Sequence, residues 1–210
     1  MTDDEFLNPP SQFNNEITQY PVRVWEMILI VMGAIALIGA AVVGLGIKVL
    51  NNAYSPIRAE AIAKSLIDYR IPGGSQGVFG INIGSAKLAW VQSNSNPPDV
   101  ILFVGRAPVN KETDQSQANR GFDQPPTSTA EEQFTVTNSR VENRYFCGST
   151  VPVTIETGQQ TLTDNSSTIP AIRYTVRTTE NNFERIVVLV ANGNNASEKA
   201  DNVFNSLRCN

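Results

Sequence analysis

The chain has 210 residues, enough for one domain together with a membrane anchor and a short flexible arm. It contains no histidine, which removes the usual general base, the commonest metal ligand and the usual pH switch. The net charge is -4, and the acidic excess comes from residues 1–26, which hold five acidic residues and one arginine. The rest of the chain is formally neutral and lacks the excess of lysine and arginine that phosphate backbones require, so we expect no nucleic acid among its partners.

The N-terminal region combines a polar segment with a long apolar one. Residues 1–23 are acidic, polar and interrupted by prolines, which predicts a disordered arm. Between Met27 and Ile47 there is no charged or strongly polar residue. About 20 such residues in a helix cross a hydrocarbon core roughly 30 Å thick. The acidic start and the length of the run disfavour a cleaved signal peptide. We therefore predict a single membrane-spanning helix over residues 24–50, with the lipid bilayer as one partner.

Three small residues recur at four-residue spacing along this helix: Ala36, Ala40 and Gly44. Small side chains on one face allow a second transmembrane helix to approach closely. The spacing predicts a helix-packing face, although alanine and glycine are also simply common in membrane helices.

Two features give opposite predictions for the side of the membrane on which the remaining chain lies. One basic residue, Arg23, precedes the apolar run, whereas Lys48, Arg58 and Lys64 follow it, and the positive-inside rule then favours a cytoplasmic domain. The chain also has two cysteines, a number that suits one disulfide in an oxidising compartment. We give the cysteines more weight and expect a periplasmic or thylakoid-lumenal domain.

Residues 51–210 are predicted to form one soluble domain. Ser55 and Pro56 are typical of a helix start, and an apolar face from Ala59 to Ile67 continues it until Pro72, Gly73 and Gly74 end it. A polar, proline-broken stretch over 107–132 predicts a long exposed loop. The short β-branched or aromatic runs that predict strands are Val78–Ile83, Lys87–Gln92, Val100–Gly105, Phe134–Cys147, Val151–Thr157, Ala171–Thr178 and Arg185–Ala191.

A last helix is expected after Ser197, with Ala200, Val203, Phe204 and Leu207 on one face. The order of helix, strands and helix predicts an α+β domain. We expect one antiparallel sheet, flanked by an N-terminal and a C-terminal helix.

The string from Gly73 to Gly77 matches the G-x-S-x-G motif of serine hydrolases. That motif needs a strand before the serine, a helix after it and a histidine to accept the proton. Here the order is helix then strand, and histidine is absent, so we interpret the string as a turn. Phosphate-loop, zinc and calcium motifs are also absent from the sequence, and we expect no cofactor and no metal.

Cys147 and Cys209 are the only cysteines. A bridge between them would close a loop of about 60 residues, which chain-entropy arithmetic values at about 4 kcal/mol. We predict this disulfide and expect it to hold the last helix against the sheet. Two unpaired thiols are the alternative.

Arginines recur at four-residue spacing on two predicted strands. Side chains four residues apart on a strand project from one face, so these arginines could form a patch for an anionic partner. Cross-strand ion pairs with nearby glutamates are the ordinary alternative. The spaced pairs are Arg140 with Arg144 and Arg173 with Arg177, and Arg185 on a third predicted strand joins them in the predicted patch. The glutamates are Glu142, Glu156, Glu180 and Glu184.

The stretch IRYTVRTTENNFERIVVLVANG, followed by SEKADNVFNSLRC, resembles the hairpin and closing helix of Mog1/PsbP-type α+β domains. The apolar segment followed by AEAIAKSLIDYRIPGG also resembles uncharacterised membrane-anchored proteins of cyanobacterial type. The resemblance implies a non-catalytic lumenal accessory protein of a photosynthetic membrane complex. No signature residue matches, so it assigns no functional residue.

The leading functional prediction is therefore a membrane-anchored, non-enzymatic accessory or assembly protein that binds a membrane protein complex. One alternative is an envelope enzyme that uses carboxylates alone, with Glu131, Glu132 or Glu156 as candidates; two facing carboxyl groups would favour it. A second alternative is a module for lipids or small ligands, which would need a sizeable apolar cavity between helix and sheet.

Overall fold

The computed structural model describes residues 23–109, 134–161 and 167–209. Nearly all of the predicted N-terminal arm and most of the predicted loop over 107–132 lie outside these residues. So do Glu131 and Glu132. The chain divides into two units, Met1–Leu45 and Gly46–Asn210, and the boundary falls within the first helix.

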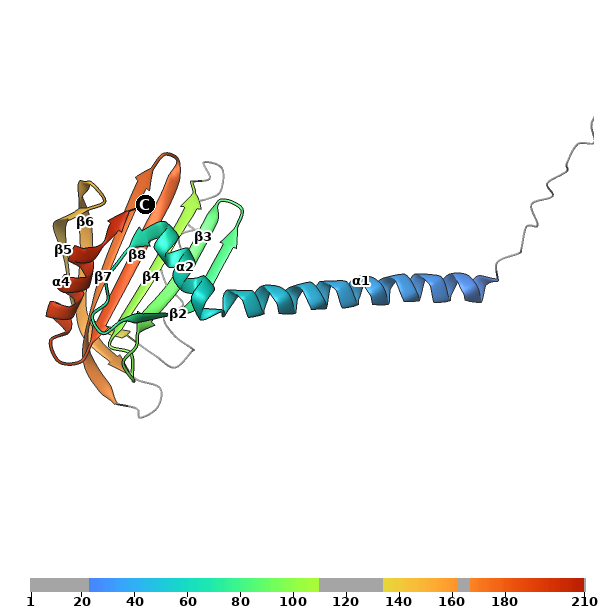
Figure 1. The fold of residues 1–210 in the computed structure, drawn as a ribbon, viewed down its shortest axis with the longest axis horizontal. Coiled ribbons are helices and arrows are strands. Elements are labelled where there is room, and N and C mark those ends of the chain that lie inside the picture. Colours follow the sequence, from blue (N-terminus) through green and yellow to red (C-terminus); the bar gives the residue numbers. More distant parts are fainter. Residues whose placement is uncertain (1–22, 110–133, 162–166, 210) are drawn as a thin grey trace, which may run out of the picture. The chain divides into compact units, whose positions relative to one another are not determined.

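Helix α1, Val24–Ala53, confirms the predicted apolar helix and extends it by three residues (Figure 1). At about 1.5 Å per residue its 30 residues are long enough to cross a membrane, and its composition is apolar enough to do so. None of its most apolar stretch is buried within the protein, which distinguishes α1 from the core helix of a soluble domain.

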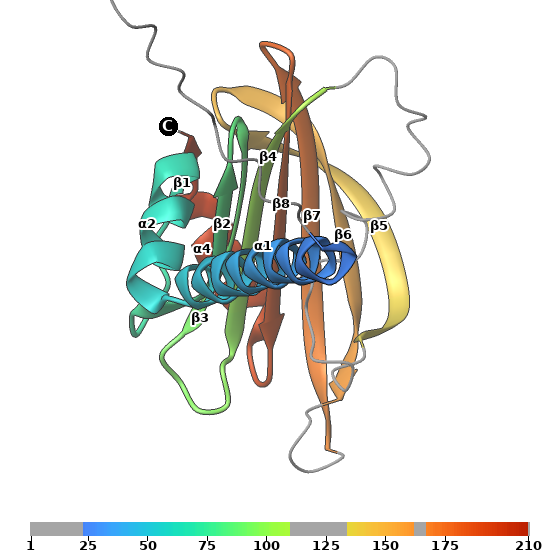
Figure 2. The ribbon, with the colours of Figure 1, turned by 90° about the vertical axis from the view of Figure 1, so that its right-hand side faces the viewer.

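The second unit is built on one seven-stranded sheet in which every neighbouring pair is antiparallel. Its strand order is β2-β3-β4-β8-β7-β6-β5, with β5 at one edge (Figure 2). This confirms the predicted α+β class, although the later strands are longer than expected. The strands are β2 Ser75–Ile83, β3 Ala86–Ser93, β4 Val100–Pro108, β5 Phe134–Phe146, β6 Ser149–Thr161, β7 Thr168–Glu180 and β8 Phe183–Asn192.

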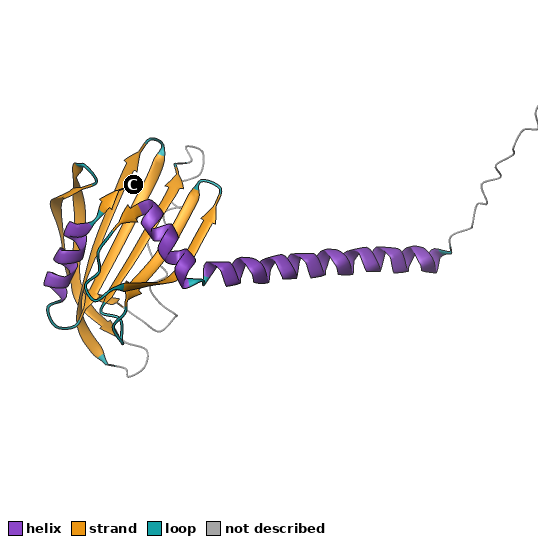
Figure 3. Ribbon diagram, viewed as in Figure 1, coloured by secondary structure: helices purple, strands orange, loops and turns teal. Residues whose placement is uncertain are grey.

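Helices α2 (Pro56–Leu66) and α4 (Ala196–Ser206) pack on the same face of the sheet, α2 on β2 and β3 and α4 on β7 and β8 (Figure 3). The two-residue strands β1 (Ile67–Asp68) and β9 (Arg208–Cys209) pair with each other and join the end of α2 to the C-terminal segment. Both predicted flanking helices are therefore confirmed.

The observed starts of α2 and α4 agree only in part with those predicted from the sequence. Ser55 is the N-cap of α2 and Pro56 follows it, as predicted. The predicted cap Ser197 is wrong, because α4 begins at Ala196 after Asn195, whose φ of 61° is left-handed. Asparagine tolerates this conformation better than other residues with a side chain.

Two glycines let α2 lie directly on the backbone of β2. A Cβ atom on Gly77 would collide with the backbone oxygen of Pro56 and would lie 2.7 Å from the Cβ of Ala59. One on Gly80 would lie 2.6 Å from the Cα of Ala59. Gly73, with φ of +82°, forms the turn that precedes β2. The string from Gly73 to Gly77 is thus a turn and a packing surface, which confirms its structural interpretation.

Buried side chains occupy both faces of the central strands. The larger cluster lies under the helices and joins residues of α2 and α4 to inward residues of the strands, such as Leu102 and Leu189. Because strand side chains alternate, neighbouring residues face the other way. Ile101, Phe103, Ile186, Val188 and Val190 form a second buried cluster on that opposite face.

Asp99, in the connection between β3 and β4, joins this connection to α4. Its carboxylate accepts hydrogen bonds from Ser93 Oγ and Ser95 Oγ, both at 2.7 Å, and pairs with Lys199 Nζ at 2.8 Å. Partial burial alone would raise the pKa of Asp99, but the bonds from Lys199, Ser95 and Ser93 outweigh it and lower the pKa to about 2.

Because the pKa of Asp99 is lower in the folded than in the unfolded state, its contribution to stability is full above the usual aspartate pKa of about 4 and is lost as pH falls towards 2. We expect Asp99→Asn to lower the free energy of unfolding at neutral pH by about 1–2 kcal/mol, a value reduced for partial solvent screening. Urea unfolding at pH 7 and pH 3 measures this effect, and the difference between variant and unchanged protein should shrink at the lower pH. The exposed Asp68→Asn is the control, with an expected change below about 0.5 kcal/mol.

Candidate functional site

The structure divides the five predicted arginines between the two faces of the sheet. Arg140 and Arg144 of β5 face the helices, as does Arg185 of β8, which follows from their register with buried residues of that face. Arg173 and Arg177 of β7 alternate with the buried Tyr174 and point to the opposite face. The five residues therefore do not form one patch.

The arginines of β5 hold structure together. Arg140 pairs with Glu142 at 2.7 Å, and Arg144 pairs with Glu142 at 2.9 Å and with Asp201 of α4 at 2.5 Å. Asp201 also accepts a hydrogen bond from the Tyr174 hydroxyl at 2.9 Å. The two arginines hold the pKa of the Glu142 carboxyl below its usual range. Arg144 thus connects the edge strand to α4.

The arginines of β7 also have carboxylate neighbours. Arg173 pairs with Glu156 of β6 at 2.6 Å, and Arg177 lies 3.5 Å from Glu184 of β8. The ordinary alternative, cross-strand pairing, therefore describes these two arginines. Glu156, a candidate for a carboxylate enzyme, lies in the Arg173 ion pair.

Arg185 belongs to a different arrangement, a row of cations across three neighbouring strands. Arg185 of β8 is opposite Arg106 of β4, and Arg106 is opposite Lys87 of β3. All three lie on the helix-facing side, because the nearest residues on the same face of β3, β4 and β8 are the buried Ala89, Val104 and Val187. At this end of the sheet the face under the helices thus changes from apolar to basic. Lys87 Nζ donates to Ser65 Oγ of α2 at 3.3 Å.

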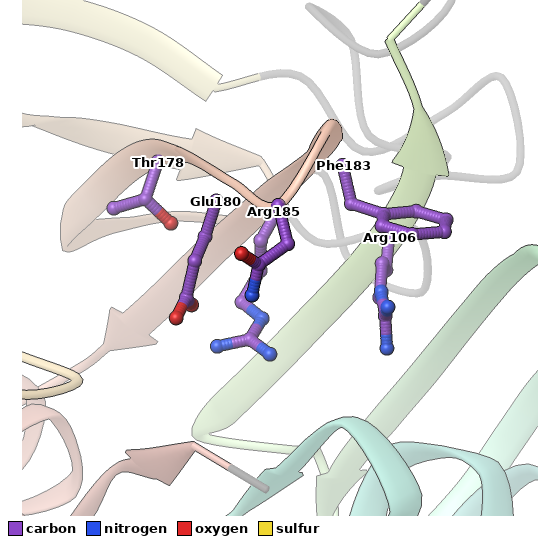
Figure 4. Close-up of a pocket in the computed structure, with 6 residues that line it drawn as sticks. Arg106, Thr178, Glu180, Phe183 and Arg185 are labelled. Carbon is purple, nitrogen blue, oxygen red and sulfur yellow. The ribbon is translucent and has the colours of Figure 1, made fainter.

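Arg106 and Arg185 line a hollow of about 160 Å³ beside the turn between β7 and β8. Figure 4 shows their side chains extending in the same direction as that of Glu180. The guanidinium of Arg106 lies 4.1 Å from the centre of the Phe183 ring. We call this group, Arg106, Glu180, Phe183 and Arg185, the arginine hollow. Thr178 and Asn181 also line it.

Burial lowers the pKa of Arg185, while Glu180 opposes this change and Arg106 adds to it. This means that the positive charge of Arg185 is partly removed from water and lies within range of a like charge. A polar group that offers negative charge at this place would stabilise the guanidinium.

A second hollow of about 440 Å³ adjoins the first and shares Glu180 and Arg185 with it. Its lining includes both cysteines, which form a disulfide with their Cα atoms 5.2 Å apart. The predicted bridge is thereby confirmed. Arg185 Nη1 lies 3.7 Å from Cys147 Sγ, so the arginine hollow and the disulfide are neighbours.

Cys147 does not lie in a strand as predicted. It is the first residue of the turn between β5 and β6, and both Cys147 (φ 49°) and Gly148 (φ 85°) are left-handed. A two-residue turn of this kind matches the twist of the strands that it joins. Cys209 reaches it from β9 rather than directly from α4.

The residues predicted to form a helix-packing face lie on α1. Ala36, Ala40 and Gly44 all lie on the exposed part of α1, and their role in helix packing stays a prediction. Among residues 23–109, 134–161 and 167–209, there is no group of three or more potential metal-ligating side chains.

Sequence reasoning missed Arg106 and Lys87, since each is a single basic residue at the end of an apolar strand.

No model of a known protein family matches the chain, and neither does any curated protein.

Proposed function

We propose that this is a single-pass membrane protein whose α+β domain lies outside the cytoplasm and acts as a non-enzymatic accessory or assembly subunit of a membrane protein complex. The observation that carries the proposal is the disulfide between Cys147 and Cys209 in a chain with a membrane-length apolar helix. Disulfides persist in the periplasm and in other oxidising compartments. The resemblance to PsbP-type domains supports the thylakoid lumen and a photosynthetic complex.

Edge strand β5 is the surface that we propose for the partner. It is 13 residues long, and within the described ranges 23–109, 134–161 and 167–209 it pairs only with β6. Val141 and Tyr145 expose 64% and 73% of their surface there, on the face turned away from the helices. An open strand edge with exposed apolar side chains can accept an extended segment of another protein through backbone hydrogen bonds.

We expect the full-length protein, solubilised in a mild detergent, to co-purify with a larger membrane complex. Val141→Lys together with Tyr145→Lys should remove most of this association, because charges on an edge strand oppose strand addition. Ile83→Lys is the matched control, since Ile83 is also exposed (66%) but lies at the end of β2 near the opposite edge. Native electrophoresis and size-exclusion chromatography give the readout.

Migration of the unchanged protein only as a free monomer would count against a partner. Equal loss of the complex in the Ile83 variant would count against β5 as the contact.

A further inference from the structure

We propose that the start of α2 lies against the phospholipid headgroups of the bilayer that α1 crosses. The surface consists of Tyr54, Ile57 and Arg58, and we call it the juxtamembrane surface. The inference rests on the membrane anchor of the proposed function, but it depends neither on the accessory role nor on a partner at β5.

The first argument is the exposure of Ile57. Residues two positions apart on a helix are about 200° apart around its axis, so Ile57 points away from the sheet on which Ala59 is buried. Its exposed fraction of 84% is larger than that of any other large apolar side chain in residues 23–109, 134–161 and 167–209. Single exposed apolar residues are ordinary, but Tyr54, close by in the chain, also exposes 61% of its surface. Packing within the domain therefore accounts for neither side chain.

The second argument is that the start of α2 is held close to the end of α1. Only Tyr54 and Ser55 separate the two helices, and Ala53, the last residue of α1, is buried. The Tyr54 ring meets the Phe79 ring of β2 edge-on, with their centres 5.4 Å apart. These residues all belong to the unit Gly46–Asn210, so the juxtamembrane surface has a defined place beside the last turn of α1.

The third argument is the distance from the apolar run. Ala53 follows Ile47, the last residue of that run, by six positions, which is about 9 Å of helix. The headgroup layer is about 5–8 Å thick on each side of the hydrocarbon core, and any tilt of the helix shortens the distance further. The side chains of Tyr54 and Ile57 can therefore reach the headgroups.

The fourth argument is chemical and identifies the occupant. Residues 48–58 contain Lys48 and Arg58 but no acidic residue, which suits a surface of phosphate groups. Tyrosine rings favour the membrane interface, because one end of the ring is apolar and the other forms hydrogen bonds. An exposed aromatic residue, an exposed aliphatic residue and a cation beside a membrane-length helix fit a phospholipid surface.

The test places one tryptophan at the proposed contact. Trp25→Phe and Trp90→Phe remove both natural tryptophans, and Ile57→Trp then supplies the only one. The full-length variant is inserted, one chain per disc, into nanodiscs of phosphatidylcholine and phosphatidylglycerol with a tryptophan-free scaffold. We expect emission at shorter wavelength than in water, loss of fluorescence when the lipids carry a nitroxide near the headgroup, and protection from acrylamide in the buffer. Circular dichroism verifies that the variants are folded.

Ile83→Trp in the same background is the matched control. Ile83 is also exposed (66%), but it lies six residues beyond Gly77, the part of β2 that contacts the start of α2, which is about 20 Å along the strand. Its tryptophan should be quenched by acrylamide and should not respond to the nitroxide lipids.

A second pair of variants tests the cation. In the Ile57→Trp background, Arg58→Glu should reduce quenching by the nitroxide lipids, because a carboxylate is repelled by phosphate groups. Arg70→Glu makes the same change of charge at an exposed position after α2 and should leave the quenching unchanged.

The outcomes separate this proposal from the membrane anchor. Elution of the chain apart from the nanodiscs would contradict the anchor itself. A chain that stays with the nanodiscs while the Ile57→Trp and Ile83→Trp variants respond alike would keep the anchor and overturn the juxtamembrane surface. Protection from acrylamide without quenching by the nitroxide lipids would also overturn it, since protein rather than lipid would then cover this surface.

Discussion

Replacing Cys147 and Cys209 together by serine is expected to lower the free energy of unfolding by about 4 kcal/mol. The bridge joins residues 62 positions apart, so it removes many conformations from the unfolded chain. It also holds β9 beside the turn between β5 and β6. The ladder of β1 and β9 has only two residue pairs and is too short to hold the C-terminal segment alone.

Urea unfolding with and without reductant measures this loss. The chain has no other cysteine, so reductant should destabilise the unchanged protein to about the level of the serine variant and should have no effect on that variant. A serine variant as stable as the unchanged, oxidised protein would show that the bridge does not contribute as expected.

The disulfide also illustrates how far the sequence predicts this fold. Two cysteines in an otherwise cysteine-free chain indicate a bridge, and the apolar run indicates α1 without any knowledge of tertiary contacts. The turn at Cys147 was missed because the pair Cys147-Gly148 is not one of the usual Asn-Gly or Asp-Gly turn signals. The start of α2 was predicted because Pro56 marks it. The start of α4 was missed because Asn195, which takes a left-handed conformation, precedes it.

The order of the strands in the sheet could not be predicted from local sequence. Strand β4 lies between β3 and β8, and its register with β8 brings Arg106 opposite Arg185. These residues are 79 positions apart in the chain, and no turn between their strands defines the register. The sequence therefore places Arg185 in one patch with the four arginines of β5 and β7. Of these, Arg140 and Arg144 share its face, where they pair with Glu142 and Asp201.

Ile38→Lys combined with Val42→Lys is expected to remove the chain from membranes. Each lysine near the centre of a spanning helix costs about 3 kcal/mol and replaces a favourable apolar residue, so the pair costs about 6–8 kcal/mol. Both residues are exposed on α1, so lysine there causes no steric conflict within the chain. Ile38→Leu with Val42→Leu is the control and should stay in the membrane fraction.

We propose that α1 holds the domain at a membrane. Flotation of full-length protein with membranes after an alkaline wash without detergent tests this proposal. We predict that the unchanged chain floats with the membranes and that the double-lysine variant does not. Recovery of the unchanged full-length chain in the soluble fraction would contradict the membrane anchor, and with it the proposed compartment and accessory role.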